Sequence, residues 1–189
     1  MTTKSWPQID YLPVALIALM TLTRFHHFGD VLHLPDASLA VFFFAGFFRK
    51  KILFGFLLAL AALIDYVAIQ GGTSSYCVSA AYVFLIPTYG VMWIAGRYAA
   101  TLNNSTPASL AKSFGLLSIA VIAAFMISNG SFYLFSGKFP DMAWGDYLQR
   151  VAKYFPLYAS SAVIYVLVGY ALTKLVKLLP SRDQQHSTH

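Results

Sequence analysis

Six apolar segments, joined by short polar connections, constrain this chain more than any other feature of its sequence. They cover approximately residues 11–25, 37–48, 52–69, 79–98, 114–135 and 154–179. A helix needs about 20 apolar residues, within a range of about 17–25, to cross the core of a bilayer. The segment at 37–48 falls below that range. It either starts earlier, near Val31, with a kink at Pro35, or only dips into the membrane.

Charged residues are too few to cover a surface in water. They make up 11% of the 189 residues, and hydrophobic residues 58%, whereas a soluble domain usually has about 25% charged residues. The net charge of +6 does not indicate nucleic-acid binding, because the 13 basic residues are scattered and mostly flank the apolar segments. The sequence therefore predicts an all-α integral membrane protein, a single domain of six transmembrane helices over 1–189, with a short polar tail at about 180–189.

The basic residues also predict an orientation, because lysine and arginine are enriched on the cytoplasmic side. Six spans put both termini on one side. The basic residues of that side are Lys4, Arg49, Lys50, Lys51, Arg97, Lys112, Lys174, Lys177 and Arg182, and those of the other are Arg24, Lys138, Arg150 and Lys153. Nine against four predicts cytoplasmic termini. On the outer side, Trp144, Tyr147, Leu148, Val151 and Phe155 recur at helical spacing, which predicts a short amphipathic helix on the membrane interface.

Cys77 is the one cysteine of the chain, and it lies in the outward connection GGTSSYCVSAAY. Ser74 or Ser75 is a candidate cap for the helix that follows. Cys77 would then lie in its first turn, where the helix dipole favours the thiolate. A thiolate is a strong donor to cobalt, copper, zinc or iron. The alternative is a small residue packed at the helix end.

Other outward residues suit an organic ligand. Asp65 lies in the outer part of the third segment, where an acid is costly in lipid and needs a partner. It is either a hydrogen-bond acceptor at the floor of an outer cavity, or it snorkels to the interface or pairs structurally with Tyr66 or another hydroxyl. His26, His27, Asp30 and His33 fall within HHFGDVLH, whose spacing matches no common zinc site. Aromatic residues from the outer connections complete a bowl-shaped candidate site.

The stretch GGTSSYCVSAAYVFLIPTYG, with Asp65 before it, resembles the cobalamin-specific BtuM group of substrate-binding S-components of energy-coupling-factor (ECF) transporters. The resemblance extends over essentially the whole chain. It implies six helices in the bacterial cytoplasmic (inner) membrane, with cobalamin bound on the outer face and carried into the cell. It also implies that Cys77 is an axial ligand to the cobalt, and that Asp65 and Tyr82 bind the ligand. Location and chemistry add Tyr76, His27, Phe132 and Tyr133.

The implied partner is an ECF module, made of a coupling subunit and ATPases, or another ABC-type energiser. The sequence itself contains no phosphate-binding loop of the GxxxxGK[ST] type. Many S-components carry alanines four residues apart in the first helix, whereas here Ala15 is followed at that spacing by Leu19. A thiolate opposite cyanide would weaken the cobalt–cyanide bond, so a further hypothesis makes Cys77 a catalytic residue for removing cyanide from cyanocobalamin.

Two other classes of function stay open at this stage. One is a membrane oxidoreductase of thiol or haem chemistry, with Cys77 or the histidines as ligands. Such an enzyme usually needs a second cysteine or paired histidines across helices. The other is a divalent-metal permease for cobalt or nickel that uses His26, His27 and Asp30. The colour of the purified protein separates these classes: a corrin spectrum, a haem spectrum, or colourless protein that binds metal ions.

Overall fold

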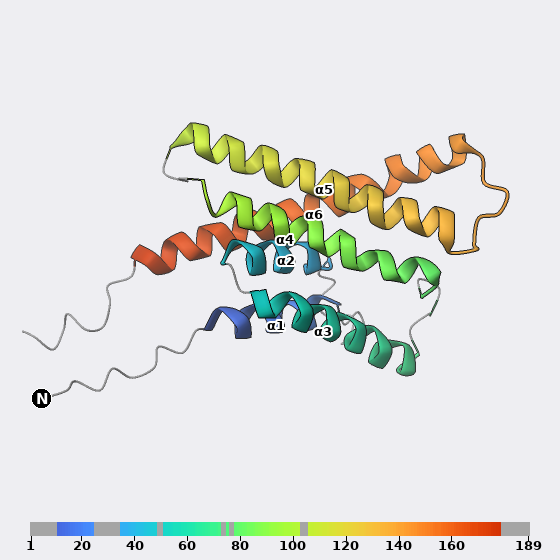
Figure 1. Cartoon of the computed structure of the whole chain (residues 1–189), viewed down its shortest axis with the longest axis horizontal. Coiled ribbons are helices and arrows are strands. Elements are labelled where there is room, and N and C mark those ends of the chain that lie inside the picture. Colours follow the sequence, from blue (N-terminus) through green and yellow to red (C-terminus); the bar gives the residue numbers. More distant parts are fainter. Residues whose placement is uncertain are drawn as a thin grey trace, which may run out of the picture.

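The computed structural model describes residues 11–24, 35–48, 51–72, 75, 78–102 and 106–178, and every secondary-structure element in them is helical. The elements are α1 (Tyr11–Arg24), α2 (Ser38–Phe47), α3 (Lys51–Gln70), the 3-10 helix η2 (Ala80–Phe84), α4 (Leu85–Ala99), α5 (Pro107–Phe135) and α6 (Trp144–Leu178). They lie roughly along one direction, the long axis of the molecule (Figure 1). The predicted all-α class is confirmed for the described part of the chain.

Three helices are long and apolar enough to cross a membrane: α3, α5 and residues Trp144–Leu175 of α6. Most of their residues are not covered by the rest of the bundle, as lipid-facing helices require. The helices α1 and α2, with 14 and 10 residues, are shorter apolar helices. The 3-10 helix η2 continues into α4 without a break, so residues 80–99 form one helical rod.

The short helix α2 is the centre of the bundle. Every residue from Ser38 to Gly46 is buried, because α1, α3, α4 and α6 all pack around it. A helix that is apolar on all sides is stable only when it is covered on all sides. At about 1.5 Å per residue, α2 is about 15 Å long, which is half the thickness of a bilayer core of about 30 Å. Its apolar sequence therefore reflects burial in protein.

The helices α2 and α4 meet at their backbones. A Cβ atom added to Gly96 would lie 2.9 Å from both the carbonyl carbon of Phe43 and the backbone nitrogen of Phe47. A Cβ atom at Gly46 would lie 2.8 Å from the carbonyl carbon of Trp93. Small residues such as glycine let two helix backbones approach this closely. Each glycine therefore makes room for the backbone of the other helix.

The last two helices begin earlier than the apolar segments predict. The helix α5 starts at Pro107 instead of residue 114, because the Thr106 hydroxyl caps the Ser109 amide at 3.2 Å and proline suits the first helical position. The predicted amphipathic helix at Trp144–Phe155 is the first part of α6, although Pro156 follows it. Tyr147 stacks on Tyr133, and Phe155 packs edge-on against Phe125 of α5. These contacts hold this part against the bundle as one continuous helix.

Candidate functional site

The candidate site lies at the end of the bundle where α3 and α5 finish and η2 and α6 begin, on the right in Figure 1. We call this end the α3/η2 end. The connection that contains Cys77 starts after Gly72 and finishes before Val78. The rings of Phe84 in η2 and Phe135 in α5 stack there with centroids 5.1 Å apart. Four helix termini thus share one end with the cysteine-containing connection.

Arg24, the last residue of α1, organises the polar centre of this end. Its Nε donates to Asp65 Oδ1 at 2.7 Å, and its Nη2 donates to Asp65 Oδ2 at 2.6 Å. This two-point geometry is the strongest form of an arginine–carboxylate pair. The hydroxyl of Tyr82 in η2 also donates to Asp65 Oδ2, at 2.7 Å. Asp65 therefore has the partners that an acid in an apolar helix requires.

The third nitrogen of Arg24 reaches α2 and α4. Its Nη1 donates to Tyr89 Oη at 2.7 Å, to Ser38 Oγ at 3.0 Å and to Asp36 Oδ2 at 3.2 Å. Asp36 Oδ1 accepts the backbone N–H and the hydroxyl of Ser38 at the start of α2. One guanidinium thus links α1 to α2, α3 and α4. We call the six residues Arg24, Asp36, Ser38, Asp65, Tyr82 and Tyr89 the Arg24 cluster.

The charges of the Arg24 cluster are unequal in number and in exposure. One arginine faces two aspartates. The Arg24 side chain is only 10% exposed, whereas the side chains of Asp65 and Asp36 are 24% and 38% exposed. Beneath the guanidinium, Tyr89 is buried and stacks on the buried Phe42, with ring centroids 4.3 Å apart. The positive charge is therefore inside, and both carboxylate side chains are more exposed than the arginine.

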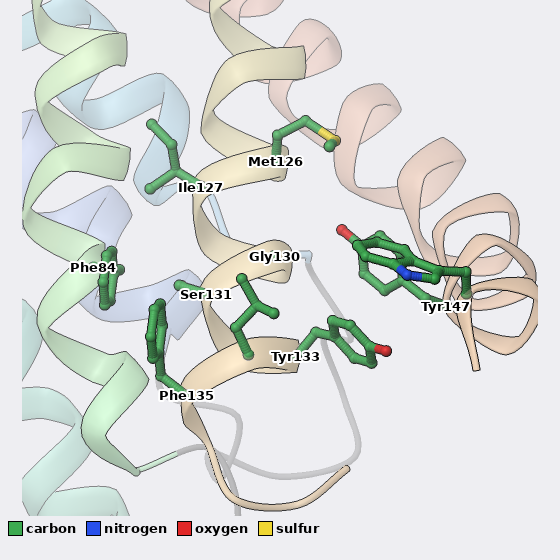
Figure 2. Close-up of a pocket in the computed structure, with 10 residues that line it drawn as sticks. Phe84, Met126, Ile127, Gly130, Ser131, Tyr133, Phe135 and Tyr147 are labelled. Atoms are coloured by element: carbon green, nitrogen blue, oxygen red, sulfur yellow. The ribbon is translucent and has the colours of Figure 1, made fainter. Parts of the chain in front are cut away.

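Two apolar cavities flank this end. The larger, of about 390 Å³, is lined by residues of η2, α5 and α6 that include Phe84, Tyr133 and Tyr147. Figure 2 shows that the side chains lining the larger cavity lie on both flanks of α5, with Phe84 and Phe135 on one side and Tyr133 and Tyr147 on the other. The smaller, of about 280 Å³, lies between α3 and η2–α4 and includes Tyr82 and Tyr89 in its lining. Asp65 lines neither cavity.

Only some of the predicted site residues are described. Asp65 and Tyr82 are in direct contact. Tyr133 lines the larger cavity, where its hydroxyl donates to the carbonyl oxygen of Met142 at 2.6 Å. Phe132 packs edge-on against Phe139 and lies outside the lining of either cavity. Three predicted site residues lie outside the described residues: His27, Tyr76 and Cys77. The whole stretch HHFGDVLH, with His26, Asp30 and His33, also lies outside them.

The predicted helix cap in this region is wrong. The side chain of Ser79, instead of Ser74 or Ser75, accepts the backbone N–H of Ala81, and the helix begins at Ala80. Cys77 therefore precedes the cap of η2 by two residues in the sequence. The expected thiolate stabilisation by the first turn of that helix loses its basis. Within the described residues, no three side chains of the His, Cys, Asp and Glu types gather into a possible metal site.

Sequence reasoning missed Arg24, Asp36 and Tyr89 as site residues. In the sequence, Arg24 was counted only among the basic residues that predict the orientation in the membrane. Its signal was present, because a lone arginine at the end of an apolar helix needs an acidic partner. Asp65, as an acid in an apolar helix, also needed a partner, and Tyr66 was one of the predicted candidates. The structure instead leaves Tyr66 62% exposed and pairs Asp65 with Arg24 and Tyr82.

Replacing Tyr82 with phenylalanine tests this pairing. We expect the Tyr82→Phe variant to lose about 1.5 kcal/mol of unfolding free energy, because a hydrogen bond to a charged group is worth about 1.5–3 kcal/mol and this one is partly exposed. The measurement is denaturant unfolding of the detergent-purified protein, followed by circular dichroism. The matched control, Tyr66→Phe, removes an exposed hydroxyl next to Asp65 and should leave stability unchanged. An equal loss in both variants would contradict the assigned pair.

Comparisons with known proteins do not assign this site. No family model matches the chain. No curated protein matches it either.

Proposed function

We propose that this protein is a membrane transport protein that binds cobalamin at the α3/η2 end and carries it into a bacterial cell. In this proposal the Cys77 sulfur coordinates the cobalt, and Asp65, Tyr82 and the aromatic residues contact the rest of the ligand. The helix bundle lies in the cytoplasmic membrane with both termini in the cytoplasm, and the short helix α2 is enclosed by the other helices. The α3/η2 end then faces outward. An ECF module or another ABC-type energiser drives release into the cell.

The observation that carries the proposal is the hydrogen bond between Tyr82 and Asp65. The resemblance to the BtuM group names these two residues as ligand-binding, together with Cys77. They come from different helices, and the chain between them contains Cys77. Their contact brings together two of the three residues that the resemblance names. Polar groups in an apolar helix bundle are costly and are therefore a default functional site.

The two cavities set a limit on how the ligand is held. Pockets for drug-sized ligands have volumes of about 300–1,000 Å³, and a corrinoid is larger than such ligands. The cavities of about 390 and 280 Å³ each suit only a part of it. In the proposal the outer connections supply the remaining walls. The aromatic lining of the larger cavity suits apolar parts of the ligand, because aromatic side chains bury large areas with defined geometry.

Cyanocobalamin titration of the purified protein tests the cobalt–sulfur bond. We expect the corrin absorption bands to shift on binding, because a thiolate replaces the ligand on one axial side of the cobalt. Cys77→Ala should bind more weakly and leave the bands unshifted. An unshifted spectrum with the wild-type protein, or the same shift with Cys77→Ala, would contradict the proposed coordination. Release of cyanide, leaving with its bonding electrons while cobalt stays trivalent, is measured in the same samples.

Growth distinguishes transport from binding. A bacterium that lacks cobalamin uptake and depends on the vitamin should grow when it expresses this chain. Expression of Cys77→Ser at the same level should restore growth poorly. Binding without growth rescue would leave a cobalamin-binding membrane protein and remove the transport step from the proposal.

A further inference from the structure

We propose that the Arg24 cluster is a specificity determinant that accepts N–H donor groups of the ligand and rejects carboxylates. The inference rests on the proposed function, gives Asp65 and Tyr82 a specific chemical role in it, and adds Asp36 and Arg24, which the resemblance does not name. In a corrinoid, the donor groups are the primary amides on the periphery of the ring. The cluster would thereby distinguish the amidated vitamin from its carboxylated derivatives.

The first argument is the direction of the Tyr82 hydrogen bond. The Tyr82 hydroxyl proton is directed to Asp65 Oδ2 over 2.7 Å, and Arg24 donates two further hydrogen bonds to the same carboxylate. A phenolic oxygen whose proton is engaged still has its acceptor lone pairs. Tyr82, which is half-buried, therefore offers an acceptor to any group that reaches it. A ligand group there has to bring its own hydrogen.

The second argument is the placement of charge. Each of the three guanidinium nitrogens donates inside the cluster, and the acceptors are Asp65, Asp36, Ser38 and Tyr89. Its side chain is the least exposed of the three charged ones. The cluster carries one positive and two negative charges, so an approaching ligand meets a net negative field and carboxylate oxygens. Carboxylates are acceptors only when ionised.

These two features define the chemistry that fits. A primary amide brings two N–H donors and no charge, so it can bond to Tyr82 or to an accessible aspartate oxygen. An ionised carboxylate has only acceptor atoms and a negative charge. Its oxygens would face the oxygens of Tyr82 or of an aspartate with no hydrogen atom between them. Specificity of this kind comes from rejection of the wrong group as well as from attraction of the right one.

The test compares cyanocobalamin with the monocarboxylic acids obtained by hydrolysing one peripheral amide at a time. Affinities for the detergent-purified wild-type protein are measured by calorimetric titration at neutral pH. We expect at least one acid to bind about tenfold or more weakly than cyanocobalamin, because like charges in a partly buried site repel strongly. In Asp36→Asn, which removes one negative charge but keeps an acceptor for Ser38, that ratio should fall by about threefold or more.

The control Asp183→Asn removes the same charge from the polar C-terminal tail, which the proposal places on the cytoplasmic side, and should keep the wild-type ratio. Equal affinities of wild type for all the acids and for cyanocobalamin overturn the inference while the proposed function stands. A ratio that is unchanged in Asp36→Asn, or lowered equally in Asp183→Asn, also overturns it. Absence of any cyanocobalamin binding by wild type overturns the proposed function, and this inference with it. The wild-type comparison needs no variant, so it holds even if Asp36→Asn does not fold.

Discussion

Replacing Arg24 with methionine is expected to lower the free energy of unfolding by about 3 kcal/mol. Removing one partner of a buried ion pair typically costs about 3–5 kcal/mol, because it leaves an uncompensated charge in an apolar environment. Here two carboxylates lose their counter-charge. The lower end of that range applies because both carboxylates remain partly exposed. Methionine keeps an unbranched apolar side chain in place of the aliphatic part of arginine, so most of the loss reports the charge and its hydrogen bonds.

Detergent-solubilised protein, unfolded by denaturant and followed by circular dichroism, provides the measurement. The matched control is Arg97→Met. Arg97 is exposed on α4, where its guanidinium lies over the Trp93 ring at 4.9 Å, a contact worth about 0.5–1 kcal/mol at exposed sites. Arg24→Lys separates charge from geometry, since a lysine cannot reproduce the two-point pair with Asp65, and it should fall between wild type and Arg24→Met. Equal stability of Arg24→Met and Arg97→Met would show that the cluster does not hold the helices together.

Replacing Gly96 with alanine is expected to lower the free energy of unfolding by about 3 kcal/mol and to lower the yield of monodisperse protein. An extra carbon in a well-packed core usually costs about 1–3 kcal/mol, and occasionally more. At Gly96 the added carbon would meet the backbone of Phe43 and Phe47. Backbone atoms inside a helix cannot rotate away as a side chain can. The helices α2 and α4 would have to separate along their contact.

Thermal unfolding, with recovery of monodisperse protein in detergent, compares Gly96→Ala with the control Gly55→Ala. No atom of the described residues lies within 4 Å of a Cβ atom at Gly55 in α3. That control should be unchanged or more stable by up to about 1 kcal/mol, since alanine is the better helix former. Gly46→Ala should behave like Gly96→Ala, because it meets the backbone of Trp93. Wild-type stability of Gly96→Ala would contradict the backbone contact between α2 and α4.

The helix bounds show how far local sequence reaches. Apolar segments predicted helices at 11–25, 37–48 and 52–69, and the structure has them at Tyr11–Arg24, Ser38–Phe47 and Lys51–Gln70. In an apolar environment the backbone has to satisfy its own hydrogen bonds, and a helix does so within one segment. The two ends of an apolar segment are therefore sufficient to place such a helix. The starts of α5 and α6 were misplaced because capping and ring contacts extend a helix beyond its apolar run.

The sequence by itself determined the helical class, the approximate bounds of most helices and the need of Asp65 for a partner. Only the tertiary structure decided that this partner is Arg24, that Tyr82 completes the pair, and that α2 lies buried at the centre. Hydropathy is a property of each segment and can be read along the chain. Which charge meets which carboxylate depends on the helix ends that packing brings together, and Arg24 and Asp65 are 41 residues apart.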